Sequence, residues 1–284
     1  ADLAGTIKSN SAGMEEPEFS NALAKGFALD MGLSLGALNY DFDISDTAGP
    51  SKLVGGSQGG SFQLAVDASR MLLSGSGQAV EATFSSAELP FPEVKLSYAE
   101  SGFNLTMPLS KAEAAQDFAL LYKVVDLQVS DEIWGLFDPT GVLPHDPATL
   151  VIDTAGQARL KSDLLGTAEG TPPDAELLSL DIKDITARMA GAELTGKGAF
   201  TFDNTDLTTY GGAPVPTGTL DMILTGGNGL LDKLVSMGLV AEDQAMGARM
   251  MIAMFAKAGE GEDVLTSTLE FKDKHFYANG QQLQ

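Results

Sequence analysis

Apolar and polar residues alternate with a period of two along much of the chain, which is the pattern of half-buried β-strands. The segments that show it most clearly are 38–44, 62–66, 94–98, 220–224 and 265–271. In the first of them, Asp41 falls between Tyr40 and Phe42. Strands with one solvated face favour antiparallel pairing, so we predict a mainly β protein with an elongated or curved antiparallel sheet.

The alternation changes phase between Ile182 and Ile185, which predicts a β-bulge at about Asp184. Glycines gather between alternating segments, and we interpret them as turns where strands reverse. They are Gly55-Gly56, Gly59-Gly60, Gly75 and Gly77, Gly211-Gly212 and Gly226-Gly227. A candidate break at residues 162–174 is rich in Gly and Pro and is interpreted as an inserted loop, so we expect one β-rich domain over residues 1–284.

Helical periodicity is concentrated near the C-terminus. Residues 228–240 and 241–258 carry apolar side chains at three-to-four spacing, and Gly238 lies where the first of these helices would end. Shorter helices are predicted near residues 17–24 and 130–137. The pattern therefore indicates a β-dominated chain with a helical pair near its C-terminus.

The second helix of this pair carries a wide apolar stripe that includes Met246, Met250, Met254 and Phe255. Methionine side chains are flexible and suit variable hydrophobic ligands, so these four residues are candidate ligand-binding residues. The alternative is that the stripe packs the helix against one face or the open end of the sheet.

The charge of the chain excludes several classes of partner. There are 17 basic and 39 acidic residues, and the formal net charge is −22. Nucleic acids and anionic lipid surfaces are bound through Lys and Arg, so we exclude nucleic-acid partners and polybasic membrane docking. The absence of Cys and the presence of only two His exclude disulfides, thiolate metal sites and the usual His-rich zinc sites. No run of about 18 apolar residues occurs, so we expect no transmembrane segment.

Two short motifs look catalytic but lie in the wrong context. Residues 55–59 match the G-x-S-x-G nucleophile elbow, yet an alternating strand follows where the elbow needs a helix, so we interpret Ser57 as part of a hairpin turn. Residues 191–198 match a P-loop until Gly198 replaces the required Ser or Thr, and a strand follows there too. We therefore predict no catalytic residue and no enzyme activity.

Other candidate groups have structural interpretations. The carboxylate clusters at 41–46 and 203–206 lack the spacing of an EF-hand, and we interpret them as solvated positions of the sheet. His145 lies in a turn fixed by two flanking prolines, which gives it a structural role. Trp134 is interpreted as a core anchor. We expect no metal site and no cofactor.

One block of sequence is distinctive: Asp138-Pro139, followed by Leu143-Pro-His-Asp-Pro-Ala-Thr-Leu150. Further characteristic segments lie at 118–134, 190–198, 202–206, 226–234, 242–251 and 278–283. Together these segments, which span most of the chain, resemble the Gram-negative envelope family known as domain-of-unknown-function family 2125. The ending, a strand that runs into Ala278-Asn279-Gly280, is also similar to the AsmA-like superfamily.

The resemblance implies a periplasmic protein of repetitive antiparallel β-structure, with no catalytic residues to carry over. It also implies a signal peptide and further β-segments before the present N-terminus. Ala1 fits either the end left by a signal peptidase or the end of a fragment. Because Ala1-Asp2-Leu3 resembles an interior position of family members, we expect a fragment of a longer chain.

Two functional hypotheses follow. The first is a non-enzymatic periplasmic envelope protein that binds lipid or another hydrophobic ligand on the concave face of its β-sheet. The alternative is a structural or interaction protein that pairs through its sheet edges with itself or with an envelope partner. The sequence leaves the ligand and the oligomeric state open.

Overall fold

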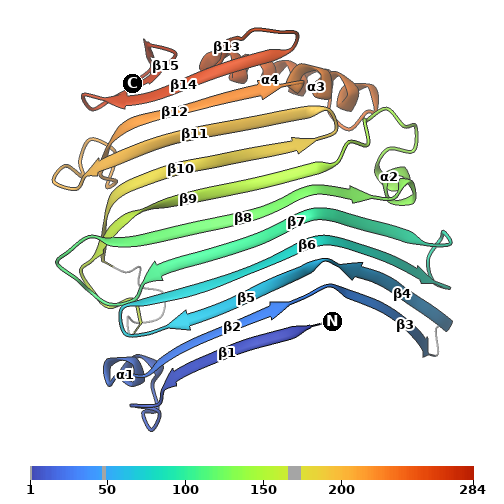
Figure 1. Cartoon of the computed structure of the whole chain (residues 1–284). Helices are drawn as coiled ribbons and strands as arrows, with labels where there is room; N and C mark the ends of the chain where they lie inside the picture. The colour runs from blue at the N-terminus through green and yellow to red at the C-terminus, as the bar shows by residue number, and fades with distance from the viewer. Residues whose placement is uncertain (1, 47–48, 166–173) are drawn as a thin grey trace.

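The computed structural model describes residues 2–46, 49–165 and 174–284 (Figure 1). Within these ranges the chain forms one sixteen-stranded sheet and, in addition, four helices. The strands are β1 (Leu3–Asn10), β2 (Ala28–Leu35), β3 (Leu38–Asp46), β4 (Gly49–Ser57), β5 (Gly59–Val66), β6 (Arg70–Ser86), β7 (Val94–Pro108), β8 (Gln116–Val129), β9 (Ala148–Leu160), β10 (Ala175–Met189), β11 (Ala192–Asp203), β12 (Val215–Thr225), β13 (Lys257–Ala258), β14 (Val264–Lys272), β15 (His275–Ala278) and β16 (Gln281–Gln282). The helices are α1 (Phe19–Ala24), α2 (Asp131–Phe137), α3 (Gly227–Ser236) and α4 (Glu242–Phe255).

The sheet is a single curved antiparallel layer that is not closed into a barrel (Figure 1). Its main path is β1-β2-β5-β6-β7-β8-β9-β10-β11-β12-β14-β15-β16, with β3, β4 and β13 paired beside it. The predicted mainly β fold and the helical pair near the C-terminus, α3 and α4, are therefore confirmed. The candidate break at 162–174 falls between β9 and β10, and its residues 166–173 lie outside the described part of the chain.

The strand register gathers apolar side chains on one face of the sheet, which we call the apolar face. One row of directly opposed residues crosses twelve strands, from β1 to β15, and ten of its members are apolar. The row is Ile7, Met31, Leu64, Leu73, Leu105, Leu120, Thr154, Ile182, Gly198, Leu220, Leu269 and Ala278. Successive residues of a strand point to opposite faces, so the alternation seen in the sequence becomes a continuous apolar surface.

The opposite face, the polar face, carries hydrophilic side chains at the intervening positions. A neighbouring row there is Thr6, Gly32, Gln63, Ser74, Asn104, Leu121, Asp153 and Asp184. Cross-strand ion pairs join Lys123 to Glu100 and Lys183 to Asp153. Much of the acidic charge is thereby placed where water solvates it.

Five neighbouring strand paths bend at the same level of the sheet. We call this line the crease. The pairing register is the same on its two sides, so five residues lie opposite one another along it: Ala37, Gln58, Ala79, Ala99 and Asp126. Ala79 and Asp126 have positive φ angles of 45° and 54°. At the crease the alternation of apolar and polar positions shifts by one residue in all five paths. Because the shift occurs at the same level in each, neighbouring strands stay in register and apolar side chains remain on the apolar face on both sides of the crease.

The crease corrects our interpretation of several glycines as reversals. β4 and β5 do not pair with each other: both pair with β6, so residues 55–60 run along one bent path and form no hairpin. Gly75 and Gly77 also lie inside β6. A Cβ on Gly75 would stand 2.5 Å from the ring of Phe103, so this glycine makes room for an aromatic side chain of the next strand.

Other local predictions are confirmed. The register of β10 shifts between Ile182 and Ile185, where the bulge was expected. Of the segment that imitates a P-loop, Gly191 lies in the two-residue turn between β10 and β11 and residues 192–198 belong to β11; the turn residues Ala190 and Gly191 have φ angles of 54° and 84°. Positive φ at both positions is the requirement of a type I′ turn.

Helices cover the apolar face only toward its ends. At one end α1 inserts Leu23 between Val66 and Leu109 to form a small core. At the other end α3 and α4 lie over β11, β12 and β14. Among the described residues no large side chain is fully buried, and the accessible surface is 16775 Å². A compact protein of this mass exposes about 11,600 Å², so an unusually large share of this molecule is open to its surroundings.

Candidate functional site

The apolar face holds a cavity of about 480 Å³ beside α3, toward the hairpin that joins β10 and β11. Five consecutive strands supply its floor, through Tyr122 of β8, Leu150 of β9, Ala187 of β10, Leu194 of β11 and Leu224 of β12. Each of these side chains is on the apolar face because of the register, although they are far apart in the sequence. Leu230 of α3 lies at one side of the cavity.

A second cavity, of about 460 Å³, lies beneath α4. Met222 and Leu265 line it from the sheet, and Ile252 and Phe255 line it from the helix. It shares Leu194 and Leu224 with the first cavity, so the two adjoin, and we call them together the apolar groove.

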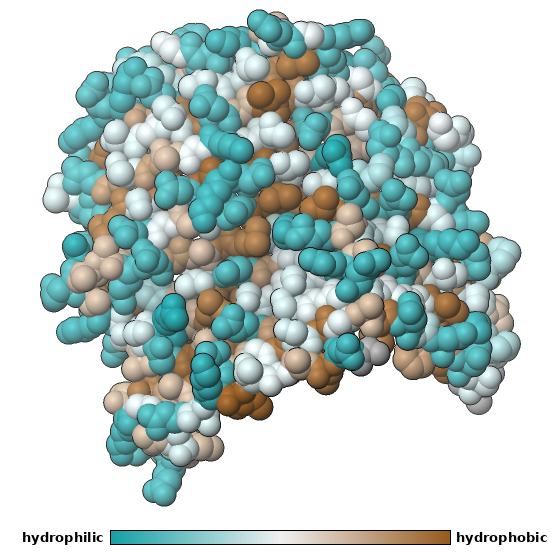
Figure 2. Space-filling view, in the orientation of Figure 1, coloured by the Kyte–Doolittle hydropathy of each residue, from teal (hydrophilic) through white to brown (hydrophobic). Residues whose placement is uncertain are grey.

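The apolar groove has the size and chemistry of a site for an elongated apolar molecule. It spans six strands from β8 to β14, which at about 4.8 Å between strands is about 24 Å. Its lining is almost entirely carbon, and Tyr122 at its open side is 47% exposed. Ligand cavities of about 300–1,000 Å³ with mainly apolar walls are typical of small-molecule sites. Figure 2 shows hydrophobic side chains at the surface between hydrophilic ones.

Polar contacts fix the helical pair above the groove. Asp263, in the turn before β14, accepts hydrogen bonds from the backbone N–H groups of Asn228 and Gly229, at 3.2 Å and 2.8 Å, and so caps the N-terminus of α3. The Arg249 guanidinium of α4 donates to Asp232 at 2.6 Å and thereby holds α4 against α3.

The C-terminal end of α4 is fixed to the sheet in the same way. The carbonyl oxygen of Phe255 accepts hydrogen bonds from the hydroxyl of Ser267, at 2.5 Å, and from the side-chain amide of Asn279, at 2.9 Å. Ser267 is buried and lines the cavity beneath the helix, so this bond also satisfies its hydroxyl group. The roof of the groove is therefore anchored at both ends.

Asp263→Asn should loosen this roof. Partial burial raises the pKa of the Asp263 carboxyl, but the hydrogen bonds from Gly229 and Asn228 and the charge of Arg249 outweigh it, so that pKa lies below its ordinary value of 3.8. The ionised carboxylate thus stabilises the fold at pH values above 3.8, and this contribution is lost as the pH falls through the lowered pKa. We expect a loss of about 1 kcal/mol in the free energy of unfolding at neutral pH, measured by urea denaturation.

Asp273→Asn is the matched control for this experiment. Asp273 has a φ of 51°, close to the 50° of Asp263, so the pair separates the capping carboxylate from the preference of Asn for this conformation. The difference between wild type and Asp263→Asn should shrink below pH 3.8. A difference that persists unchanged in acid, or that Asp273→Asn reproduces, would contradict the capping role.

The structure divides the four ligand-binding residues predicted from the sequence. Phe255 lines the groove. Met246, Met250 and Met254 lie on the other side of α4 and are 58%, 67% and 63% exposed. Ala245 is fully buried and Ile252 lines the groove, which shows that α4 turns a different face toward the sheet.

Sequence reasoning missed the strand residues that form most of the groove, above all Leu194 and Leu224. Both are apolar members of alternating segments, which predicts that they lie on an inner face but not which strands are neighbours. The missing signal is register: Leu194 lies opposite Leu224, and Ala187 lies opposite Leu194. Only the pairing of β10, β11 and β12 brings the three together.

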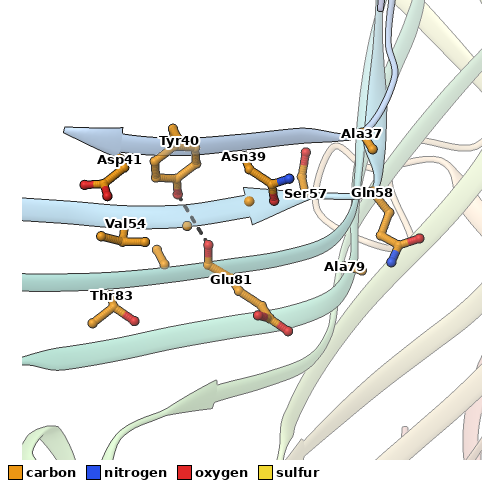
Figure 3. Close-up of a pocket in the computed structure, with 13 residues that line it drawn as sticks. Ala37, Asn39, Tyr40, Asp41, Val54, Ser57, Gln58, Ala79, Glu81 and Thr83 are labelled. Carbon is orange, nitrogen blue, oxygen red and sulfur yellow. Dashed lines mark hydrogen bonds between the residues drawn. The ribbon is translucent and has the colours of Figure 1, made fainter. Parts of the chain in front are cut away.

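A third cavity, of about 720 Å³, lies at the crease (Figure 3). Polar groups of Asn39, Ser57, Gln58 and Glu81 line it, and the Tyr40 hydroxyl donates to the carbonyl oxygen of Glu81 at 3.4 Å. Ser57 ends β4 and is followed after one residue by β5, so no helix begins there as a nucleophile elbow requires. This wall is too polar to suit an apolar ligand.

His145 and Trp134 pack against each other. Their rings stack at 4.6 Å with an angle of 6°, and His145 Nδ1 lies 3.0 Å from a carboxylate oxygen of Asp131. The contact ties the loop after α2 to that helix, in line with the structural role expected of His145. The prediction that Trp134 is a core anchor is wrong, because Trp134 is only half-buried and α2 contributes no buried residue.

The acidic clusters are engaged by protein groups. The Lys52 ammonium lies 2.8 Å from Asp41 and 3.5 Å from Asp43, while the side chain of Asp46 is outside the described part. Asp206 accepts hydrogen bonds from Lys274 and Thr209. In the described ranges there is no group of three or more His, Asp or Glu arranged to hold a metal ion.

Comparison with known proteins places the chain in a family. The model of domain-of-unknown-function family 2125, described as "uncharacterized protein conserved in bacteria", matches residues 45–279. The chain belongs to this family. No curated protein and no solved structure is significantly similar to it. In the described residues, no helix of this family member combines the length and apolar character needed to cross a bilayer.

Proposed function

We propose that this chain is a non-enzymatic periplasmic envelope protein that binds lipid or another hydrophobic ligand in the apolar groove. The observation that carries the proposal is the pairing of two adjoining apolar cavities: they share Leu194 and Leu224 and together cross six neighbouring strands on a face that its own helices leave partly uncovered. An apolar surface of this extent in water is unfavourable unless something covers it.

The chemistry of the groove supports selection for the apolar part of a ligand. Its lining offers almost no polar atoms, so binding would come from burial of hydrocarbon at about 0.8 kcal/mol per methylene. A polar head group would remain outside, in solvent. The net charge of −22 disfavours anionic head groups, and neutral or zwitterionic amphiphiles are the expected ligands.

Two measurements on the purified chain test this function. Organic extraction followed by mass spectrometry should recover co-purified lipid, and the delipidated protein should enhance the emission of a fluorescent fatty-acyl probe with saturable, one-site binding. An unlabelled zwitterionic lysolipid should compete with the probe. Absence of both co-purified lipid and saturable probe binding would end the proposal.

A further inference from the structure

The outer side of α4 carries exposed methionines that the groove does not use. Met246, Met250 and Met254 follow one another at intervals of four residues, so they form one stripe along the helix. Met251, which is 63% exposed, lies beside them and also lines the groove. We call Met246, Met250 and Met254 the methionine patch.

No charged side chain interrupts this stripe. Between Asp243 and Lys257 the only charged residue is Arg249. Its guanidinium is directed to α3, where it donates to Asp232 and, at 3.2 Å, to the side chain of Asn228. α4 is therefore apolar on two sides, toward the groove and toward the outside, and a helix of that composition is normally covered on both.

The patch is too small for a stable contact with a second copy of the chain. α4 has 14 residues, which gives a face about 21 Å long and about 10 Å wide. That is roughly 200 Å², against about 800 Å² per partner in a standard protein interface. Unbranched, flexible methionines also adapt to a fluid surface better than to a fixed shape.

We propose that the methionine patch docks on the surface of a zwitterionic lipid bilayer. A helix with exposed apolar side chains lies in the interfacial plane with those side chains among the upper acyl segments. Anionic bilayers are disfavoured, because the chain carries a net charge of −22, and acidic residues lie in the first turn of α4, at Glu242 and Asp243, and shortly after the helix, at Glu260.

The patch also adjoins the apolar groove. Met251 is exposed on the outer side and at the same time lines the groove next to Phe255. A docked α4 would thus place the groove beside the bilayer surface, from which a hydrophobic ligand could pass without crossing water. This second step rests on the proposed function, whereas bilayer docking does not.

Flotation with phosphatidylcholine vesicles tests the docking. The wild-type chain should float with these vesicles, and less with vesicles that contain phosphatidylglycerol. The triple variant Met246→Gln, Met250→Gln, Met254→Gln should reduce flotation at least about tenfold, since Gln keeps helix propensity and length but removes the apolar contact. Leu136→Gln with Phe137→Gln is the matched control, because these α2 residues are also 63% and 67% exposed. Circular dichroism establishes that all variants fold.

The outcomes separate the two proposals. Wild-type chain that stays with the soluble fraction, a triple variant that floats as wild type does, or stronger flotation with anionic vesicles would each overturn the docking. Light scattering that reveals a wild-type dimer dissociated by the triple variant would instead assign the patch to a second copy. Uptake of the fluorescent acyl probe from buffer is measured on the same proteins. Flotation without probe uptake would support docking and remove the ligand function. Loss of probe uptake from buffer in the triple variant would place the methionines in the ligand site and overturn the docking.

Discussion

Leu224→Glu is expected to lower the affinity for a fluorescent acyl probe by at least about tenfold. Leu224 lies where the two cavities of the apolar groove meet, so a carboxylate there would be desolvated whenever an apolar chain fills the groove. An unpaired charge buried in this way costs several kcal/mol, and about 1.4 kcal/mol suffices for a tenfold change. Probe titration of the delipidated protein gives the result.

Ile223→Glu provides the matched control. Ile223 is the preceding residue of β12, points to the polar face and is 47% exposed, so the same charge is added on the same strand but away from the groove. We expect probe affinity to stay within about twofold of wild type. Equal losses in both variants, or none in either, would show that the probe binds elsewhere.

Gly55→Ala is expected to destabilise the fold by about 2–3 kcal/mol, at the upper part of the range for an overpacked site. A Cβ at this position would stand 2.2 Å from the carbonyl oxygen of Glu81 on β6 and 2.5 Å from the Tyr40 hydroxyl. The tyrosine can rotate away, but the backbone oxygen cannot move without breaking the pairing of β4 with β6. Urea denaturation monitored by far-ultraviolet circular dichroism measures the loss.

Gly135→Ala in α2 is the comparison for that variant. A Cβ at Gly135 would meet nothing within 4 Å, and Ala is favoured over Gly in a helix by up to about 1 kcal/mol. The comparison variant should therefore be as stable as wild type or slightly more so. If Gly55→Ala unfolded at the same urea concentration as wild type, close strand approach at the crease would not be what requires this glycine.

The alternation of residues such as Tyr40, Asp41 and Phe42 was sufficient to predict strands, two sheet faces of opposite polarity and antiparallel pairing. The phase change before Ile185 predicted the bulge in β10, because a bulge is a local event that leaves a local trace. The helical pair was predicted for the same reason. What is encoded within about ten consecutive residues could be predicted from the sequence.

Features that depend on which strands are neighbours could not be predicted from the sequence. Gly55 and Gly75 looked like turn residues, but their role is to admit Tyr40 and Phe103 from adjacent strands. The methionine stripe predicted the helix α4 correctly. It predicted only in part which residues face the sheet, because packing decides which face of α4 meets the strands. Leu194 and Leu224 became site residues through register alone.

The one-layer sheet has a consequence for how the molecule holds together. Each strand touches the strands beside it and little else, as in repeat proteins, whose stability is a sum of local terms and nearest-neighbour contacts. Disruption at one place can then stay local while the remaining strands keep their pairing. An added strand would lengthen such a sheet by about 4.8 Å without rearranging the others. The architecture is modular, and its reach can be tuned strand by strand.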